Sequence, residues 1–342
     1  MFSQVDEPIG FLPDLVTMGD STPALNFRLS VERFPLKLKS KKDRLNGVKL
    51  LEFNRPPRDL EFKPIGVKEF RFREKGDSVK IWFTGVDTTS QLVILSEKRI
   101  IDTISLRPKS RIPNLTSQKL EGDKKKSVSV LPQKAVPITM NLPILSWQDS
   151  LFLLTRDSLP EKLKALIEID SLNPRTLTLK YPWREKSTYH LTIFPKGITG
   201  INGKSLKDTI LRQISVTPKD QLGNILLTLN PPDSTKQYVV SLLSNKKKLE
   251  SRILPPGKTK AEWKLMPPGD YSLELIEDTV PNGFWDSGNY LRAQQPERVF
   301  VKKLEKLRAN WDLEIIWTPT DTPPEVEDPS NPPTDKNKKE NE

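Results

Sequence analysis

The feature that most constrains this chain is the alternation of apolar and polar residues in many short runs. Residues 25–31 read Leu-Asn-Phe-Arg-Leu-Ser-Val, and residues 79–83 read Val-Lys-Ile-Trp-Phe. Neighbouring side chains of a strand point to opposite faces, so a period of two places one face on a core and the other in water. The pattern predicts half-buried β-strands along most of the chain.

Proline content also favours strands over helices. The 342 residues include 31 prolines and only 15 glycines. Proline lacks a backbone N–H and clashes with the preceding turn inside a helix. Turn-forming pairs such as Asn46-Gly47, Gly76-Asp77 and Asn202-Gly203 separate the alternating runs. At about 100–200 residues per domain, the length predicts two or three domains.

We therefore predict an all-β fold of tandem antiparallel β-sandwich modules followed by a disordered C-terminal tail. The predicted order is a remnant of an upstream module or an N-terminal arm (1–20), a β-sandwich (21–107), a polar and basic linker or long loop (108–134), a second β domain (135–218), a C-terminal β-sandwich (219–317) and the tail (318–342). Residues 158–169 fit either a helix or a strand paired with residues 177–180, and the strands on both sides favour the strand.

The charge distribution points to anionic partners or simply to a solvated basic surface. The net charge is +11, and the segment from residue 318 to the end holds seven acidic and three basic side chains, so the rest carries +15. A surplus of this size attracts polyanions. The basic run 37–44 lacks the interleaved aromatic residues of a single-strand groove. We interpret that run as the solvated end of a hairpin and predict no specific nucleic-acid partner.

The sequence offers little that could carry catalysis. His190 is the one histidine, it lies within an alternating run, and there is no cysteine. No Gly-x-Ser-x-Gly turn or phosphate-binding glycine loop occurs. We predict no catalytic residue and no cofactor, and we expect a protein that is not an enzyme.

Residues 278–289, Asp-Thr-Val-Pro-Asn-Gly-Phe-Trp-Asp-Ser-Gly-Asn, form the most distinctive local sequence. An EF-hand loop needs oxygen ligands at positions one, three, five and twelve. Asp278 and Asn282 fit positions one and five, but Val280 stands at position three and Asn289 replaces the usual glutamate. We predict a structural turn, and keep Asp278, Asn282 and Asp286 as a weak calcium candidate.

Tryptophan is the residue type most suited to binding a sugar ring, because its face is large and apolar. In strands, single tryptophans are more often core anchors, whereas Trp285 lies in the loop. Trp285 is therefore our candidate ligand-binding residue. The seven tryptophans are Trp82, Trp147, Trp183, Trp263, Trp285, Trp311 and Trp317.

The C-terminal sequence resembles the end of a family of Gram-negative envelope lipoproteins with Ig-like domains. The resemblance rests on residues 265–271 (Leu-Met-Pro-Pro-Gly-Asp-Tyr), 278–289, 295–299 (Gln-Pro-Glu-Arg-Val) and 308–315 (Arg-Ala-Asn-Trp-Asp-Leu-Glu-Ile). The domain 135–218 is similar to the family's bacterial Ig-like domain. Residues 7–11, Glu-Pro-Ile-Gly-Phe, look like the closing strand of an upstream module. The resemblance implies Ig-like or transthyretin-like modules and a C-terminal portion of such a lipoprotein.

The resemblance also implies an extracytoplasmic protein, associated with the cell envelope or outer membrane. The N-terminus lacks the basic and apolar regions of an export signal, and no run of 18 apolar residues predicts a membrane span. We expect a non-catalytic structural or interaction protein, with other envelope proteins or an anionic surface polysaccharide as partners. A glycan-binding module is the alternative, and a hydrolase is the least expected outcome.

Overall fold

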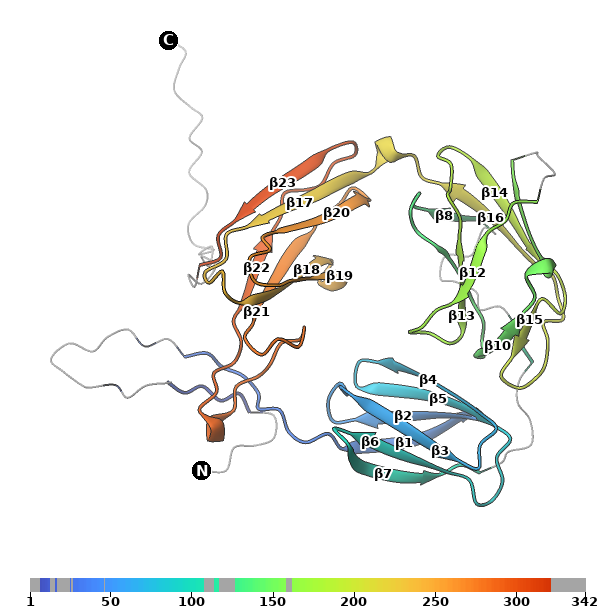
Figure 1. The fold of residues 1–342 in the computed structure, drawn as a ribbon, viewed down its shortest axis with the longest axis horizontal. Helices are drawn as coiled ribbons and strands as arrows, with labels where there is room; N and C mark the ends of the chain where they lie inside the picture. Colours follow the sequence, from blue (N-terminus) through green and yellow to red (C-terminus); the bar gives the residue numbers. More distant parts are fainter. Residues whose placement is uncertain are drawn as a thin grey trace, which may run out of the picture. The chain divides into compact units, whose positions relative to one another are not determined.

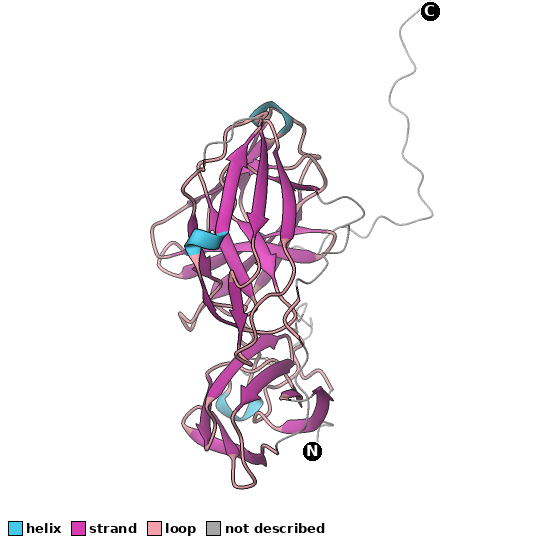
Figure 2. Ribbon diagram, turned by 90° about the vertical axis from the view of Figure 1, so that its right-hand side faces the viewer, coloured by secondary structure: helices cyan, strands magenta, loops and turns pink. Residues whose placement is uncertain are grey.

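The computed structural model describes residues 7–12, 16, 25, 27–45, 47–107, 114–116, 127–157 and 162–320. Their regular structure is almost all strand (Figure 2). The helices among them are three single-turn 3-10 helices, η1 (Asp149–Leu151), η2 (Lys219–Gln221) and η3 (Tyr290–Arg292). The chain forms two compact units, one of Phe34–Gln221 and one of Met1–Arg33 with Leu222–Glu342. The predicted all-β sandwich class is confirmed.

The first module is a sandwich of a four-stranded and a three-stranded sheet, with strand orders β1-β2-β5-β4 and β3-β6-β7 (Figure 1). Its core contains the alternate apolar residues of facing strands, including Leu51, Ile81 and Ile94. The strands are β1 (Leu38–Leu45), β2 (Val48–Phe53), β3 (Leu60–Ile65), β4 (Glu69–Lys75), β5 (Ser78–Thr84), β6 (Gln91–Ser96) and β7 (Arg99–Ser105).

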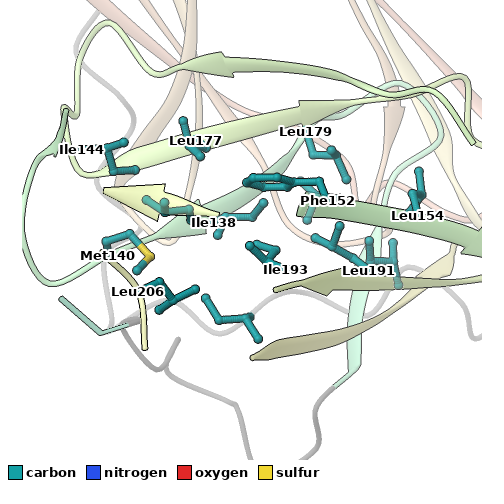
Figure 3. Packing of buried hydrophobic residues seen from close by; sticks show 14 of the residues in the cluster. Ile138, Met140, Ile144, Phe152, Leu154, Leu177, Leu179, Leu191, Ile193 and Leu206 are labelled. Carbon is teal, nitrogen blue, oxygen red and sulfur yellow. The ribbon is translucent and has the colours of Figure 1, made fainter. Parts of the chain in front are cut away.

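The second module, in the same compact unit, has sheets of order β11-β14-β16-β8, β12-β13-β9 and β10-β15. Phe152, Leu177 and Leu191 from three different strands point toward one another in its core (Figure 3). The strands are β8 (Ser127–Val130), β9 (Val136–Thr139), β10 (Ile144–Trp147), β11 (Phe152–Arg156), β12 (Leu166–Ile169), β13 (Thr176–Lys180), β14 (Thr188–Ile193), β15 (Ile198–Gly200) and β16 (Ile210–Val216).

The third module repeats the three-on-four arrangement, with strand orders β20-β17-β23 and β19-β18-β21-β22. Trp263, which is 1% exposed, lies in its core among leucines and tyrosines of both sheets. The strands are β17 (Gly223–Leu229), β18 (Gln237–Ser244), β19 (Lys247–Leu254), β20 (Lys260–Met266), β21 (Ser272–Asp278), β22 (Val299–Lys303) and β23 (Asp312–Trp317).

Two strand pairs depart from the predicted antiparallel pattern. The first and last strands of the second module, β8 and β16, pair in parallel, and so do β17 and β23 of the third. Parallel neighbours need a long connection, and here the connection is the rest of the module. Each of these modules is thus closed by strands that are far apart in sequence.

The structure also moves the predicted boundaries. The residues described between 27 and 33 belong to the unit that contains the third module, and the first module starts near Phe34 rather than at 21. The alternation of residues 27–31 predicted a strand, and this prediction was wrong. The β-type pairing there is a single isolated bridge between Ser30 and Ile9. Strand β8 and the buried Leu115 lie in the predicted linker but belong to the second module.

Residues 158–169, whose sequence fitted either a helix or a strand, include a strand in the part that the structure describes. Leu166–Ile169 is a strand that pairs antiparallel with β13, as the favoured interpretation predicted. Residues 158–161 and the tail from 321 onward lie outside the described residues, so the prediction for the tail stays a prediction. Among the described residues, no helix is long and apolar enough to cross a membrane.

The hydroxyl groups of three buried tyrosines form hydrogen bonds with backbone groups of the segments that precede strands β14, β18 and β21. The hydroxyl of Tyr271 donates to the carbonyl of Pro267 at 2.7 Å, and that of Tyr189 accepts from the N–H of Arg184 at 2.9 Å. Tyr238 does both with Asp233, donating to its carbonyl at 3.0 Å and accepting from its N–H at 3.2 Å. Burial raises the pKa of Tyr238 and Tyr271. Such bonds to backbone a few residues upstream are typical of β-sandwich tyrosine corners.

We predict that Tyr238→Phe lowers the free energy of unfolding by about 1–2 kcal/mol. The ring keeps its packing, but the backbone N–H and carbonyl of Asp233 lose their partner. Urea denaturation of the wild type and the variant measures the loss. Tyr290→Phe removes a hydroxyl from a side chain that is 62% exposed and is the control, with an expected change within about 0.5 kcal/mol. Equal effects of the two substitutions would contradict the assigned role.

Candidate functional site

The loop that follows β21 is held at its start by the carboxylate of Asp278, which is 1% exposed. This carboxylate accepts the N–H of Asn282 at 3.2 Å, the N–H of Gly283 at 2.8 Å and the side-chain amide of Gln237 at 2.7 Å. Gly283 has a φ of 77°, a conformation that favours glycine. Aspartate side chains commonly stabilise turns in this way.

A second buried carboxylate, Glu297, holds the two ends of the loop together. It is 5% exposed and lies just before β22. One of its oxygens accepts the N–H groups of Thr279 and Val280, at 2.7 and 3.2 Å, and the Thr279 hydroxyl at 3.0 Å. The other accepts the N–H of Asp286 at 2.9 Å. Because hydrogen bonds to an ionised acceptor are strong, this residue fixes the loop conformation.

The three residues of the calcium candidate lie together, but they bind one another and the backbone. The Asn282 amide donates to the carboxylate of Asp286 at 2.5 Å, and its oxygen accepts the N–H of Phe284 at 2.8 Å. Asp286 also forms an ion pair with Arg33 at 3.8 Å. This arrangement agrees with the predicted structural turn. The described residues contain no group of three or more carboxylates or histidines that could hold a metal ion, and the calcium role stays a prediction.

Trp285 is fixed in place rather than free to rotate. Its indole N–H donates to the carbonyl of Glu297 at 3.0 Å, and the side chain is 36% exposed. A ring that is already immobilised loses little conformational entropy when a ligand packs on its exposed face. The geometry is therefore compatible with the binding role predicted for this residue.

A segment from the N-terminal part of the chain completes the site. From here on, the N-terminal arm means residues 7–12 and 27–33, in place of the predicted range 1–20. Its two pieces pair at Ile9 and Ser30 through backbone bonds of 2.9 and 3.0 Å. The buried Ser30 hydroxyl accepts the N–H of Gly288 at 2.9 Å. A Cβ at Gly288 would lie 3.0 Å from that hydroxyl, so a side chain there would push its neighbours apart by a few tenths of an ångström.

Further contacts tie the N-terminal arm to the same loop. The side-chain amide of Gln295 donates to the carbonyl of Phe11 at 2.8 Å, and the Phe11 ring meets Tyr290 edge-on at 5.5 Å. Arg28 donates to the carbonyl of Pro296 at 3.3 Å. Residues 7–12 thus contact the loop of the third module.

These elements enclose an open groove of about 750 Å³ at the edge strand β22. The exposed side chains of Val299 and Val301 lie on this edge. Arg28, Arg298 and Lys302 bring three cationic groups to the lining. Its full lining is Arg28, Leu29, Trp285, Pro296, Glu297, Arg298, Val299, Phe300, Val301, Lys302, Trp317, Thr318, Pro319 and Thr320.

The groove is cationic because its one lining carboxylate, Glu297, accepts hydrogen bonds from the loop. On the neighbouring strand β21, the carboxylate of Glu277 is 3% exposed and lies 3.8 Å from Arg298. Glu277 also accepts a hydrogen bond from Lys236, which raises the pKa of that lysine. Arg298 is thereby held beside the groove by a buried acid.

The sequence indicated the loop 278–289 but not Glu297, the carboxylate that holds its two ends together. Asp278, Asn282 and Asp286, kept as the weak calcium candidate, do lie together, and Trp285 lies in the same loop. Glu297, Ser30 and the three groove cations were missed as site residues. Glu297 was present in the motif 295–299, but nothing local shows that a carboxylate there will accept backbone N–H groups. His190, as predicted, lies in a strand, with its side chain exposed on β14.

Comparisons with known proteins give only distant likenesses of fold. The N-terminal part of the bacterial S-layer protein SbsC is 13% identical, with 56% of this chain and 44% of that one covered and a TM-score of 0.29. Domains MG0-NIE-MG1 of Escherichia coli alpha-2-macroglobulin are 12% identical, with 56% and 70% covered and a TM-score of 0.24. Titin domains I67–I69 are 9% identical, with 80% and 93% covered and a TM-score of 0.15. No family model matches the sequence, and no curated protein matches it.

We predict that Glu297→Gln destabilises the third module by about 2–3 kcal/mol. The substituted amide removes the charge and turns a donor toward backbone N–H groups. Hydrogen exchange should accelerate at the amides of Thr279, Val280 and Asp286, measured by NMR alongside chemical denaturation. Glu305→Gln, at an exposed position of the same module, should change neither quantity. Unchanged exchange at those three amides in the Glu297 variant would show that the carboxylate does not hold the loop.

Proposed function

We propose that the protein is a non-catalytic structural or interaction protein of the bacterial cell envelope, built from Ig-like β-sandwich modules. The observation that carries the proposal is the groove beside β22, where a tryptophan held by a backbone bond borders a cationic edge strand. An edge strand presents unpaired backbone groups, which an extended partner can use. The site is suited to holding a partner, because its buried carboxylates already serve as hydrogen-bond acceptors for the protein itself.

Localisation at the envelope rests on the resemblance of residues 265–315 to the Ig-like envelope lipoprotein family. The same resemblance supports membership of that family. Other envelope proteins are the partners that it implies. The sequence adds that its one histidine lies within a strand and has no Gly-x-Ser-x-Gly serine to activate.

The non-catalytic proposal is tested by incubating the purified chain with panels of glycans, peptides and esters. We expect no turnover above that of a blank, because Glu277 and Glu297 are buried, at 3% and 5% exposed, and offer a substrate little access. Glu277→Gln and Glu297→Gln are the informative variants, since Glu277 and Glu297 are the two buried glutamates of the third module. Turnover that one of these substitutions abolished, while the fold persisted, would make the protein an enzyme and overturn the proposal.

A second candidate, binding of an anionic polysaccharide, is favoured by one specific observation. Arg28, Arg298 and Lys302 line the same groove as Trp285. Sugar rings pack on aromatic faces while guanidinium and ammonium groups bind carboxylate or sulfate substituents. A groove that combines both is suited to an acidic glycan better than to a neutral one.

A glycan array tests this candidate. We expect the wild type to retain acidic glycans, and Trp285→Ala and Lys302→Gln each to weaken retention about tenfold, equivalent to about 1.4 kcal/mol. Lys302→Gln keeps the loop intact, so it separates lost binding from lost folding. Lys260→Gln, on β20, is the matched control and should bind as the wild type does. Retention that neither groove variant reduces would remove the groove as the glycan site.

A further inference from the structure

The outer face of one sheet in the first module carries a row of cations. Strand register places Lys42 opposite Leu50, Leu50 opposite Lys80, and Lys80 opposite Arg73. Residues directly opposite one another in a sheet share a face. Lys75, two residues beyond Arg73, lies on this face as well, because side chains alternate along a strand. The opposite face of the same sheet contributes Val79, Ile81 and Phe83 to the core.

A further cation approaches this face from the second module, which belongs to the same compact unit. Arg175 follows the Asn173-Pro174 turn, and its guanidinium carbon lies 5.6 Å from the ring centre of Trp82. The ammonium of Lys80 lies 5.3 Å from the same ring. Trp82 is 1% exposed and packs into the core of the second module. The indole thus holds two cations near each other.

These side chains line a pocket of about 330 Å³. Four of its seven lining residues are cationic and none is acidic. The lining is Leu50, Arg73, Lys75, Ser78, Lys80, Trp82 and Arg175. A pocket of this size accommodates a phosphate or sulfate group together with part of the molecule that carries it.

The carboxylates on the same sheet face are already bound elsewhere. Glu52 accepts hydrogen bonds from Ser40 and Lys42, at 2.5 and 2.9 Å. Glu69 forms an ion pair with Arg71 at 3.6 Å. Glu74 lies opposite Val79 in the register and therefore on the core face. The four pocket cations have no carboxylate in the lining to neutralise them.

This arrangement has an electrostatic cost in the free protein. Like charges directly opposite one another destabilise a sheet, and Arg73 and Lys80 are such a pair. Burial lowers the pKa of Lys80, and the charges of Arg175, Arg44 and Arg73 lower it further. Burial likewise lowers the pKa of Arg175, followed by the charge of Arg73. The Nε of Arg175 is buried and has no hydrogen-bond partner.

We propose that this pocket is a binding site for a phosphate- or sulfate-type oxyanion, present as a free ion or carried on an anionic polymer. The guanidinium groups of Arg73 and Arg175 offer paired donors that match such oxyanions, and Lys75 and Lys80 add point charges. The oxyanion neutralises the repulsion among these cations. It contacts both modules of the unit, so its binding stabilises their association. The inference goes beyond the proposed function and does not depend on the groove.

The test compares the full-length chain with Arg73→Gln/Lys80→Gln and with a control, Lys258→Gln/Lys260→Gln, in the third module. Millimolar sodium sulfate and sodium phosphate are titrated against sodium chloride of equal ionic strength. At about ten times Kd, the oxyanion should raise the unfolding midpoint of the wild type and the control by about 3–6 °C. The pocket variant should melt higher than the wild type in chloride alone, because the repulsion is relieved, and should lose the oxyanion-specific gain.

Two further measurements, with dextran sulfate and by calorimetric titration, separate specific binding from general effects of the salt. Sulfate stabilises proteins in general by exclusion from their surface, and the pocket variant reports that background. Dextran sulfate against neutral dextran distinguishes a polymer-borne group from a free ion, and binding of either source supports the proposal. Calorimetric titration should show at least a tenfold loss of affinity in the pocket variant and a smaller loss in Arg175→Lys, which keeps the charge. Equal responses of the wild type and the pocket variant to every anion would overturn the site.

Discussion

Pairing between strands distant in sequence is the constraint on which the second and third modules depend. β8 and β17 are the first strands of their modules. β8 has its partner only when the last strand, β16, is in place, and β17, which also pairs with β20, is covered on its other edge by the last strand, β23. Pairing over such a separation carries the loop-closure entropy of the whole module. Burial of an apolar face offsets that entropy, and β17 alternates buried and half-buried residues along its full length. Each module is therefore expected to form its core and its closing pair together.

The same dependence on distant partners explains what could be predicted from sequence. The strand β5, whose alternation is clear at residues 79–83, was located nearly to the residue, because its pattern is local. β8 has four residues in a polar, basic stretch, and its position is determined by β16, which its own sequence cannot indicate. Residues 27–31 show the opposite error. They alternate as a strand should, yet their partners are the loop near Gly288 and the bridge to Ile9.

In the candidate site, the sequence indicated the residues with a recognisable spacing and missed those defined by contact. Asp278 and Asn282 carry a motif, so the turn they form was foreseeable. Glu297 is one of 44 acidic residues, and its role follows from its burial beside three backbone N–H groups that donate to it. Trp285 was predicted to bind a ligand because it lies in a loop. The structure adds that its ring is held in one orientation. Its indole N–H is anchored to the Glu297 carbonyl, so the exposed face is held still.

The two surfaces proposed for binding differ in how the free protein prepares them. In the groove, the carboxylates of Glu297 and Glu277 are already bonded to N–H groups and cations, so the lining is set before a partner arrives. In the pocket of the first module, Arg73, Lys80 and Arg175 repel one another and no carboxylate compensates them. A ligand gains there by removing an unfavourable interaction as well as by making new ones. Part of the positive charge of the chain therefore lies where an anion would relieve repulsion, and net charge alone could not distinguish this from an evenly solvated surface.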